Sequence, residues 1–364
     1  MFSFSLDKEQ KMVRDSFAEL VKKLVADSAH DMDEAGELDT DAVQKAWELG
    51  ASVSAVPEEC GGLGLPDSPM QTVLCLEELA WGDAAFAVAA TMPSLFISPV
   101  LKHGTDKQKD DYLPPVCGEQ YVPATMAMCE PDIMFDAARP KCRAERKNGS
   151  YVITGEKCFV PGARDAKYVL VAADSDDGPQ LFIVSGDNPG MQVGDRDKAE
   201  GFYALDMYRV KFDNCEIPAE DRLGGDAGAD YRDVLARTRT GLSAIATGIS
   251  RASYDVAREY AKTRVQFGDP IGTRQSVAFM VAEMAYETDA MRLMTWQAAS
   301  ALEAGKDAVR ESYLAKMYVG EMAMKVCDYG VQVMGGHGYI RDYPQERCYR
   351  NARGMAILEG FATV

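Results

Sequence analysis

The sequence has too little positive charge for a protein that binds nucleic acid. Its 364 residues include 39 lysines and arginines against 57 aspartates and glutamates, which gives a formal net charge of −18. Nucleic acids and anionic membrane surfaces are bound through clustered positive charge, so this composition disfavours both as partners. A phosphorylated small ligand is still allowed, because it needs only a few local donors.

Long apolar runs and a secretory signal are also missing. No stretch of about 18 apolar residues occurs, so the sequence predicts no membrane-spanning helix. The N-terminal segment MFSFSLDKEQ includes charged side chains and no apolar core, which argues against a signal peptide. These features favour a cytoplasmic protein.

The nine cysteines are scattered, and the sequence contains neither a C-x-x-C pair nor a histidine pair. Metal centres usually show cysteine or histidine ligands at short, regular spacing, so no metal site is predicted. A chain of this length does not need disulfides to fold, and the number of cysteines is odd. We therefore expect reduced thiols, as in a cytosol.

The remaining composition is that of an ordinary globular protein, with 47% hydrophobic and 26% charged residues. The length favours two or three domains. Residues 1–120 are predicted to form a helical domain, because their apolar residues recur at helical spacing. Glycines and prolines interrupt this pattern over residues 56–69. The helical run that follows is nearly uncharged after Asp83, so we expect it to be buried.

Two further domains are predicted from a change of pattern. Residues 121–225 contain strand-like runs, and Asn148-Gly149 between two of them is a strong hairpin signal. In residues 226–364 three long amphipathic patterns and a short terminal one predict a four-helix bundle, whose many methionines we expect to fill the core. The predicted fold class is therefore α+β and multi-domain: a helical domain, a β-sheet domain and a helical bundle.

One carboxylate stands out near the end of the chain. Glu359 follows the apolar run Met-Ala-Ile-Leu and precedes Gly360. Few polar neighbours would disfavour its charged form, which suits a general base, and a glycine lets another molecule approach the backbone closely. The alternative is an ordinary glutamate at a helix end, facing solvent.

Five segments, taken in order, resemble signatures of the acyl-CoA dehydrogenase family. They are VPEECGGLGL from Val56, DKQKDDYLP from Asp106, RVQFGDPIGTRQ from Arg264, QVMGGHGYIRDYPQER from Gln332 and the RNAR…EG ending. One such match would be weak, but five in this order, spread over essentially the whole chain, are specific. The resemblance implies an oxidoreductase that acts on the CH–CH group of an acyl-CoA in fatty acid metabolism.

The resemblance also implies FAD as the cofactor. In the family, the arginine of the R-x-Q-F-G motif reaches the FAD pyrophosphate of a neighbouring subunit and the aromatic ring packs on the adenine; these are Arg264 and Phe267 here. A planar guanidinium suits a diphosphate because it donates two parallel hydrogen bonds. The expected FAD-binding residues are Met128, Cys129, Phe159, Val160, Pro161, Arg264, Gln266, Phe267, Gln332, Gly335 and Gly336.

Glu359 matches the family's catalytic base. The resemblance implies that its backbone N–H and a ribityl hydroxyl of FAD bind the thioester carbonyl, that its carboxylate removes the α-proton, and that the β-hydride passes to the flavin. The product would be a 2-enoyl-CoA, with the electrons passed to an electron-transfer flavoprotein. Some relatives place the base on the first bundle helix, where this chain has Thr238, which cannot serve. The expected substrate-binding residues are Phe135, Arg239, Leu358 and Gly360.

The chain departs from the family pattern in its middle domain. The threonine of the family's T-E-P segment is Cys129, a weaker donor. The Gly-Ser pair that follows is Met134-Phe135, which puts bulk where the pantetheine arm is expected. The family's W-I-T segment reads Phe-Val-Pro over residues 159–161, and Pro161 has neither a hydroxyl nor an amide N–H.

These substitutions leave three interpretations: a dehydrogenase with a reshaped pocket, a subunit of a hetero-oligomer in which only some sites hold FAD, or a relative that catalyses an elimination or an enoyl reduction. Retention of Glu359 and Arg264 favours the first. In the family, relatives that act on dicarboxylyl thioesters such as glutaryl-CoA place an arginine on the buried helix of the first domain. Residues 84–98 contain no arginine or lysine, so the resemblance implies an uncharged acyl group that is short, branched or alicyclic. The resemblance further implies a homotetramer built as a pair of dimers.

Overall fold

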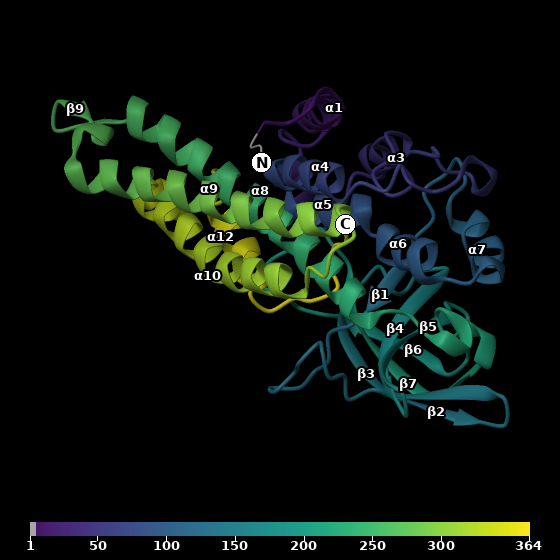
Figure 1. Cartoon of the computed structure of the whole chain (residues 1–364). Helices are drawn as coiled ribbons and strands as arrows, with labels where there is room; N and C mark the ends of the chain where they lie inside the picture. Colours follow the sequence, from purple (N-terminus) through teal and green to yellow (C-terminus); the bar gives the residue numbers. More distant parts are fainter. Residues whose placement is uncertain (1–4) are drawn as a thin grey trace.

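The computed structural model describes residues 5–364, and the N-terminal part is helical as predicted (Figure 1). Between residues 56 and 68, where a break is predicted, the only helix or strand is the short η1, and α4 begins at Pro69. The N-terminal helices are α1 Lys8–Leu24, α2 Ala29–Ala35, α3 Thr40–Glu48, η1 Glu58–Cys60, α4 Pro69–Gly82, α5 Ala84–Thr91, α6 Ser94–His103, α7 Asp106–Tyr112 and η2 Pro114–Val116.

Polar side chains fix where these helices begin. Asp7 accepts a hydrogen bond from the backbone N–H of Gln10 and forms a reciprocal capping box with it. Asp83 ends α4 and caps α5 by accepting from the N–H of Phe86. All eight residues of α5 are buried, which confirms the burial predicted after Asp83. In the described part of the chain no single helix is long and apolar enough to cross a bilayer; α5 and α6 pass that test only as a pair bent by 42°.

The middle part is a seven-stranded sheet with the strand order β1-β4-β2-β3-β7-β6 and with β5 paired to β4. The predicted hairpin is confirmed: β2 and β3 are antiparallel, and Asn148 and Gly149 take the positive φ angles of 51° and 88° that a tight two-residue turn requires. The strands are β1 Thr125–Ala127, β2 Arg143–Lys147, β3 Ser150–Pro161, β4 Tyr168–Ser175, β5 Gly178–Ser185, β6 Met191–Arg196 and β7 Met207–Pro218, followed by η3 Ala219–Asp221 and η4 Gly225–Ala227.

The C-terminal part is the predicted helical bundle. Three long helices, α8, α9 and α10, run side by side with the shorter α12 (Figure 1). Met284 and Met291 fill the core with no exposed area, whereas Met317 is 58% exposed, so the methionines are only partly core residues. The elements are α8 Tyr231–Thr263, β8 Val265–Gln266, β9 Asp269–Pro270, η5 Ile271–Thr273, α9 Gln275–Glu303, α10 Val309–Met334, α11 Gly336–Tyr339 and α12 Gln345–Gly354.

The segment after Glu359 packs against α8. A Cβ atom added at Gly241 of α8 would lie 2.7 Å from the backbone nitrogen of Thr363, so the absence of a side chain there allows the close approach. Arg237, one helical turn earlier, donates a hydrogen bond of 2.8 Å to the backbone oxygen of Val364. These contacts fix the loop that carries Glu359 between α8 and the sheet.

Candidate active site

Glu359 lies in the loop that follows α12, between buried Leu358 and buried Gly360. Only 13% of its side chain is exposed, so the alternative of a solvent-facing glutamate is wrong. One carboxylate oxygen, Oε1, accepts a hydrogen bond from Arg239. Within residues 5–364 the other oxygen, Oε2, is buried without a hydrogen-bond partner. A buried oxygen of this kind is free to accept a proton from a ligand.

The prediction that Glu359 has few polar neighbours is wrong on one point. Arg239 of α8 lies with its Nε atom 3.1 Å from Oε1 of Glu359, and only 11% of the Arg239 side chain is exposed. The guanidinium also lies over the ring of Tyr313, 5.4 Å from its centroid. Arg239, predicted as a substrate contact, therefore touches the candidate base directly.

A second cation supports the same loop. Lys316 of α10 is 7% exposed, and its Nζ atom donates a hydrogen bond of 2.9 Å to the backbone oxygen of Met355. Burial lowers the pKa of Lys316, and the negative charge of Glu359 opposes that shift. Lys316 thus satisfies a carbonyl at the end of α12, in the loop that leads to Glu359.

Cys129 contacts the backbone of Glu359 from the sheet side. Its Sγ atom accepts from the Glu359 N–H and donates to the Glu359 carbonyl oxygen, each at 3.2 Å. Burial raises the pKa of the thiol to about 12, so it is protonated at neutral pH and serves as both donor and acceptor. The close approach expected at Gly360 is made by Met128 of the same chain: a Cβ on Gly360, whose φ is +70°, would lie 2.7 Å from the Met128 Cβ.

A buried ion pair holds the segment that carries Met128 and Cys129. Lys157 of β3 has no exposed area and donates to the backbone oxygen of Met128 at 3.1 Å and to Glu130 at 2.9 Å. Glu130 also accepts from the N–H groups of Lys141 and Cys142, at 2.8 Å and 2.9 Å. No pattern in the sequence predicted this pair. Its only signal is a lysine between strand-like apolar residues, whose partner cannot be read from spacing.

The other predicted cofactor- and substrate-binding residues of the middle domain differ in conformation and exposure. Phe159 takes a positive φ of 52°, unusual for a bulky residue, and its N–H donates to Asp197 at 2.8 Å. Val160 is 1% exposed, and Pro161 pairs with β7 at the end of β3. Phe135 packs against the buried residues of the first domain and the sheet. It lies in a loop whose base is held by Tyr231, which donates to the Ala137 oxygen at 2.6 Å.

The predicted R-x-Q-F-G residues are not brought to Glu359 within one chain. Arg264 and Gln266 lie at the β8–β9 hairpin, which projects from the end of the bundle far from the sheet (Figure 1). They are exposed, and Phe267 at the turn is 92% exposed. Gln332 is exposed near the end of α10. A Cβ on Gly335 or Gly336 would meet no described atom within 4 Å.

The exposed residues of the hairpin and of the turn after α10 are chemically suited to a flavin dinucleotide. The guanidinium of Arg264 suits a diphosphate, the exposed ring of Phe267 suits adenine, and the open backbone at Gly335 and Gly336 allows close approach. Oε2 of Glu359, which has no hydrogen-bond partner in the described part of the chain, fits a site completed by a ligand. Pro161 offers no N–H to that ligand.

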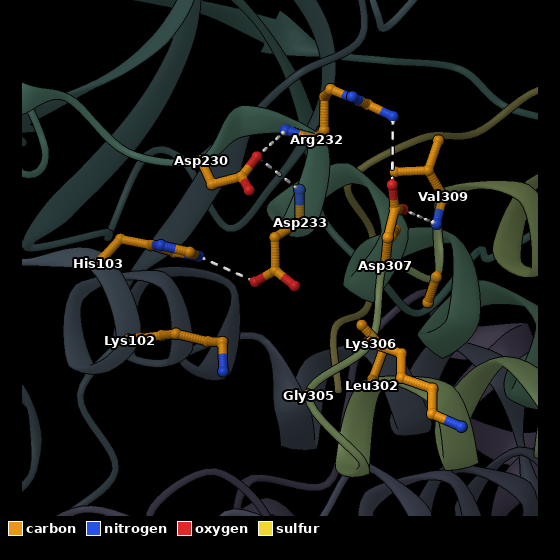
Figure 2. Close-up of a pocket in the computed structure, with 12 residues that line it drawn as sticks. Lys102, His103, Asp230, Arg232, Asp233, Leu302, Gly305, Lys306, Asp307 and Val309 are labelled. Atoms are coloured by element: carbon orange, nitrogen blue, oxygen red, sulfur yellow. Dashed lines mark hydrogen bonds and ion pairs between the residues drawn. The ribbon is translucent and has the colours of Figure 1, made fainter.

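A separate cavity of about 340 Å³ lies between the end of α6, the start of α8 and the α9–α10 loop (Figure 2). Figure 2 shows the ring of His103 directed at the carboxylate of Asp233, which it meets at 3.0 Å. Arg237 donates to the same carboxylate at 3.1 Å. The lining of this cavity does not include Glu359.

This network predicts a pH-dependent stability. Burial opposes ionisation of Asp233, but the hydrogen bond to His103 and the charge of Arg237 lower its pKa below the usual 3.8. A lowered pKa contributes stability that is complete above the unfolded-state pKa and is lost as pH falls through the folded-state pKa. Urea unfolding midpoints of the wild type and Asp233→Asn should therefore differ most above the ordinary aspartate pKa of 3.8 and converge as the pH falls through the lowered pKa of the folded state. A difference that stays constant over that range would refute the linkage.

Three family models match the chain: the acyl-CoA dehydrogenase N-terminal domain over residues 7–120, the middle domain over 125–215 and the C-terminal domain over 229–364. A probable acyl-CoA dehydrogenase of Bacillus subtilis is 32% identical, with coverage of 100% of this chain and 97% of the relative. The mitochondrial short-chain specific acyl-CoA dehydrogenase of Rattus norvegicus is 31% identical, with coverage of 100% and 89%.

Solved structures of similar fold support the same family. Butyryl-CoA dehydrogenase from Megasphaera elsdenii has a TM-score of 0.89 at 29% identity, covering 99% of this chain and 96% of the other. A structure from work on the electron transferring flavoprotein of Acidaminococcus fermentans has a TM-score of 0.89 at 31% identity, with coverage of 99% and 96%. The predicted fold class and family are confirmed. The chain belongs to the acyl-CoA dehydrogenase family, whose members are FAD-containing oxidoreductases that act on the CH–CH group of acyl-CoA thioesters.

Proposed function

We propose that the chain oxidises an uncharged short, branched or alicyclic acyl-CoA to the 2-enoyl-CoA, with Glu359 as the base that removes the α-proton. The observation that carries this proposal is the Glu359 carboxylate: its side chain is 13% exposed, and its Oε2 atom has no partner among the described residues. A general base must present such an acceptor to the substrate.

The two carboxylate oxygens of Glu359 have different environments and therefore different proposed roles. Arg239 binds Oε1 and so fixes the orientation of the side chain, which leaves Oε2 as the atom that takes the proton. The backbone N–H of Glu359 is the donor for the thioester oxygen, where negative charge develops as the proton leaves. Lys316 stabilises the loop by binding the Met355 carbonyl. Leu358 and Phe135 contribute apolar surface near the acyl and pantetheine parts of the substrate.

FAD fits the set of residues described above. Met128, Cys129 and residues 159–161 of one subunit would hold the flavin ring. The hairpin of a second subunit would hold the diphosphate and adenine through Arg264, Gln266 and Phe267, with Gln332, Gly335 and Gly336 beside them. When bound, FAD would supply the acceptor for the hydride that leaves Cβ.

The exposed hairpin supports a site shared by two chains, because Arg264 and Phe267 lie far from the sheet of their own chain (Figure 1). The family resemblance extends this pairing to the proposed homotetramer, a pair of dimers. An electron-transfer flavoprotein is the proposed electron acceptor. The likeness to the structure from work on the A. fermentans electron transferring flavoprotein supports this choice.

The visible spectrum of the protein expressed alone tests the proposed function. A flavoenzyme should be yellow, and anaerobic butyryl-CoA should bleach the flavin absorption. A colourless protein that copurifies with a related chain would instead support the subunit of a hetero-oligomer. A yellow protein that no acyl-CoA bleaches would support a different acyl-CoA reaction.

Substrate charge gives a further prediction. Every residue of α5 is buried and none is charged, so a carboxylate at the far end of an acyl chain would have no cationic partner there. Burying an unpaired carboxylate costs several kcal/mol in effective terms. In a dye-reduction assay, kcat/KM for butyryl-CoA should therefore exceed that for glutaryl-CoA by at least roughly a hundredfold, since about 1.4 kcal/mol corresponds to a factor of ten. Glutaryl-CoA or succinyl-CoA as the best substrate would refute an uncharged acyl pocket.

A further inference from the structure

The Glu359 N–H that should bind the thioester oxygen already has a partner in the chain. Cys129 Sγ lies 3.2 Å from this nitrogen and 3.2 Å from the carbonyl oxygen of the same residue. Cys129 lies on a segment held by the Glu130–Lys157 pair, so its position does not depend on the Glu359 loop alone. The two hydrogen bonds link the sheet to the loop across 230 residues of sequence.

We propose that Cys129 is a positioning residue whose thiol occupies the Glu359 N–H until the thioester carbonyl of the substrate takes it over. This inference rests on the proposed function, because it concerns the same donor. The Glu359 N–H is partly buried, and a donor shielded from solvent is costly to leave without a partner; the thiol reduces that cost in the ligand-free chain. Sulfur is a weak acceptor, so breaking its hydrogen bond to the Glu359 N–H costs little free energy when the thioester oxygen takes its place.

The hydrogen bond from the Cys129 thiol to the Glu359 carbonyl can hold the loop in place while the Glu359 N–H changes partner. The thiol is protonated because burial raises its pKa to about 12, and its S–H donates to the Glu359 carbonyl. That bond does not involve the N–H, so it can hold the loop while the N–H changes partner. Oε2 of Glu359 has no partner among residues 5–364, so the same loop presents both an exchangeable donor and a vacant acceptor.

Side chains with different acceptor strength should shift stability and ligand affinity in opposite directions. In Cys129→Ser the hydroxyl is the stronger acceptor, so it competes better with the thioester oxygen. In Cys129→Ala the N–H has no partner, so the ligand-free protein is less stable and the thioester gains a donor without competition. Thermal stability should therefore follow the order serine, cysteine, alanine, and thioester affinity should follow the reverse order.

Calorimetric binding of acetyl-CoA and S-ethyl-CoA tests this proposal. Acetyl-CoA is a thioester that has no Cβ–H to oxidise, and S-ethyl-CoA is a thioether of the same length without the carbonyl. Proteins of equal flavin content should be compared. The dissociation constant for acetyl-CoA should be about fivefold or more lower in Cys129→Ala than in Cys129→Ser, as one neutral hydrogen bond implies. The constants for S-ethyl-CoA should agree within about twofold.

Cys215→Ala and Cys215→Ser are matched controls, because Cys215 is a buried thiol in β7, outside the contacts described for Glu359. Parallel changes for both ligands, or no change for either, would overturn the exchange. If the serine variant does not fold, the alanine variant against wild type decides in the same way. Failure of the proposed function gives a different result. If the Cys129 variants show the expected difference in acetyl-CoA affinity but the wild type never oxidises butyryl-CoA, the proposed reaction is refuted and the exchange at the Glu359 N–H still stands.

Discussion

Replacing Glu359 with glutamine should abolish dehydrogenation while the protein keeps its flavin. An amide has nearly the same shape as the carboxylate and can still contact Arg239, but its oxygen is too weak a base to take an α-proton. General-base catalysis contributes roughly a hundredfold to ten-thousandfold, so the rate of anaerobic flavin bleaching by butyryl-CoA should fall by that factor. The measurement is stopped-flow absorbance of the wild type and the variant at equal flavin content.

The matched control for this variant is Glu321→Gln on α10, an exposed glutamate on another element. It should bleach at the wild-type rate. Glu359→Gln that bleaches within about tenfold of the wild type would mean that another group takes the proton. Loss of flavin from Glu359→Gln would instead point to a cofactor-binding role for Glu359.

Among the substitutions considered for stability, replacing Lys157 with methionine should cause the largest loss in the free energy of unfolding. Lys157 has no exposed area and bonds to the Met128 carbonyl and to Glu130, whose side chain is 4% exposed. Methionine preserves the length of the side chain but leaves the Glu130 carboxylate buried without its cationic partner, with only the N–H groups of Lys141 and Cys142 as donors. Removing one partner of a buried pair costs about 3–5 kcal/mol. The free energy of unfolding, or the thermal midpoint where unfolding is irreversible, should fall accordingly.

Lys211→Met is the control, because Lys211 of β7 pairs with Asp213 at 3.2 Å and its side chain is 58% exposed. Exposed pairs contribute about 0–1 kcal/mol, so this variant should be close to the wild type. Equal effects from the two lysines would contradict a dominant role for the buried pair. The double variant Lys157→Met, Glu130→Met should lose less than Lys157→Met alone, since it buries no unpaired charge.

The order of helices and strands was predictable because it depends on local patterns. The uncharged run after Asp83 becomes α5, and Asn148-Gly149 becomes the turn between β2 and β3. Helical spacing of apolar residues predicted α8, α9 and α10. The expectation that the methionines of residues 226–364 fill the core overstated their burial, because Met317 is 58% exposed. Periodicity identifies one face of a helix but not which face another element covers.

The candidate site was only partly predictable. Glu359 was identified by the apolar run before it and by the resemblance of its segment to a family signature. Its contacts could not be read from spacing, because Arg239 and Cys129 lie 120 and 230 residues away in sequence. Which carboxylate oxygen is bonded to Arg239, and which has no partner among residues 5–364, depends on how α8 and the sheet contact the loop. Lys316 was missed for the same reason, since a buried lysine on an amphipathic helix resembles an exposed one in sequence.

The central claim is that Glu359 removes a proton from the α-carbon of a bound thioester. The most direct test is anaerobic incubation of acetyl-CoA with the protein in D2O, followed by mass spectrometry of the acetyl group. Acetyl-CoA has α-protons but no β-hydride, so exchange reports the base without any redox step. The wild type should incorporate deuterium, and Glu359→Gln should incorporate no more than the solution without protein. Equal incorporation by both proteins would contradict the assignment of Glu359 as the base.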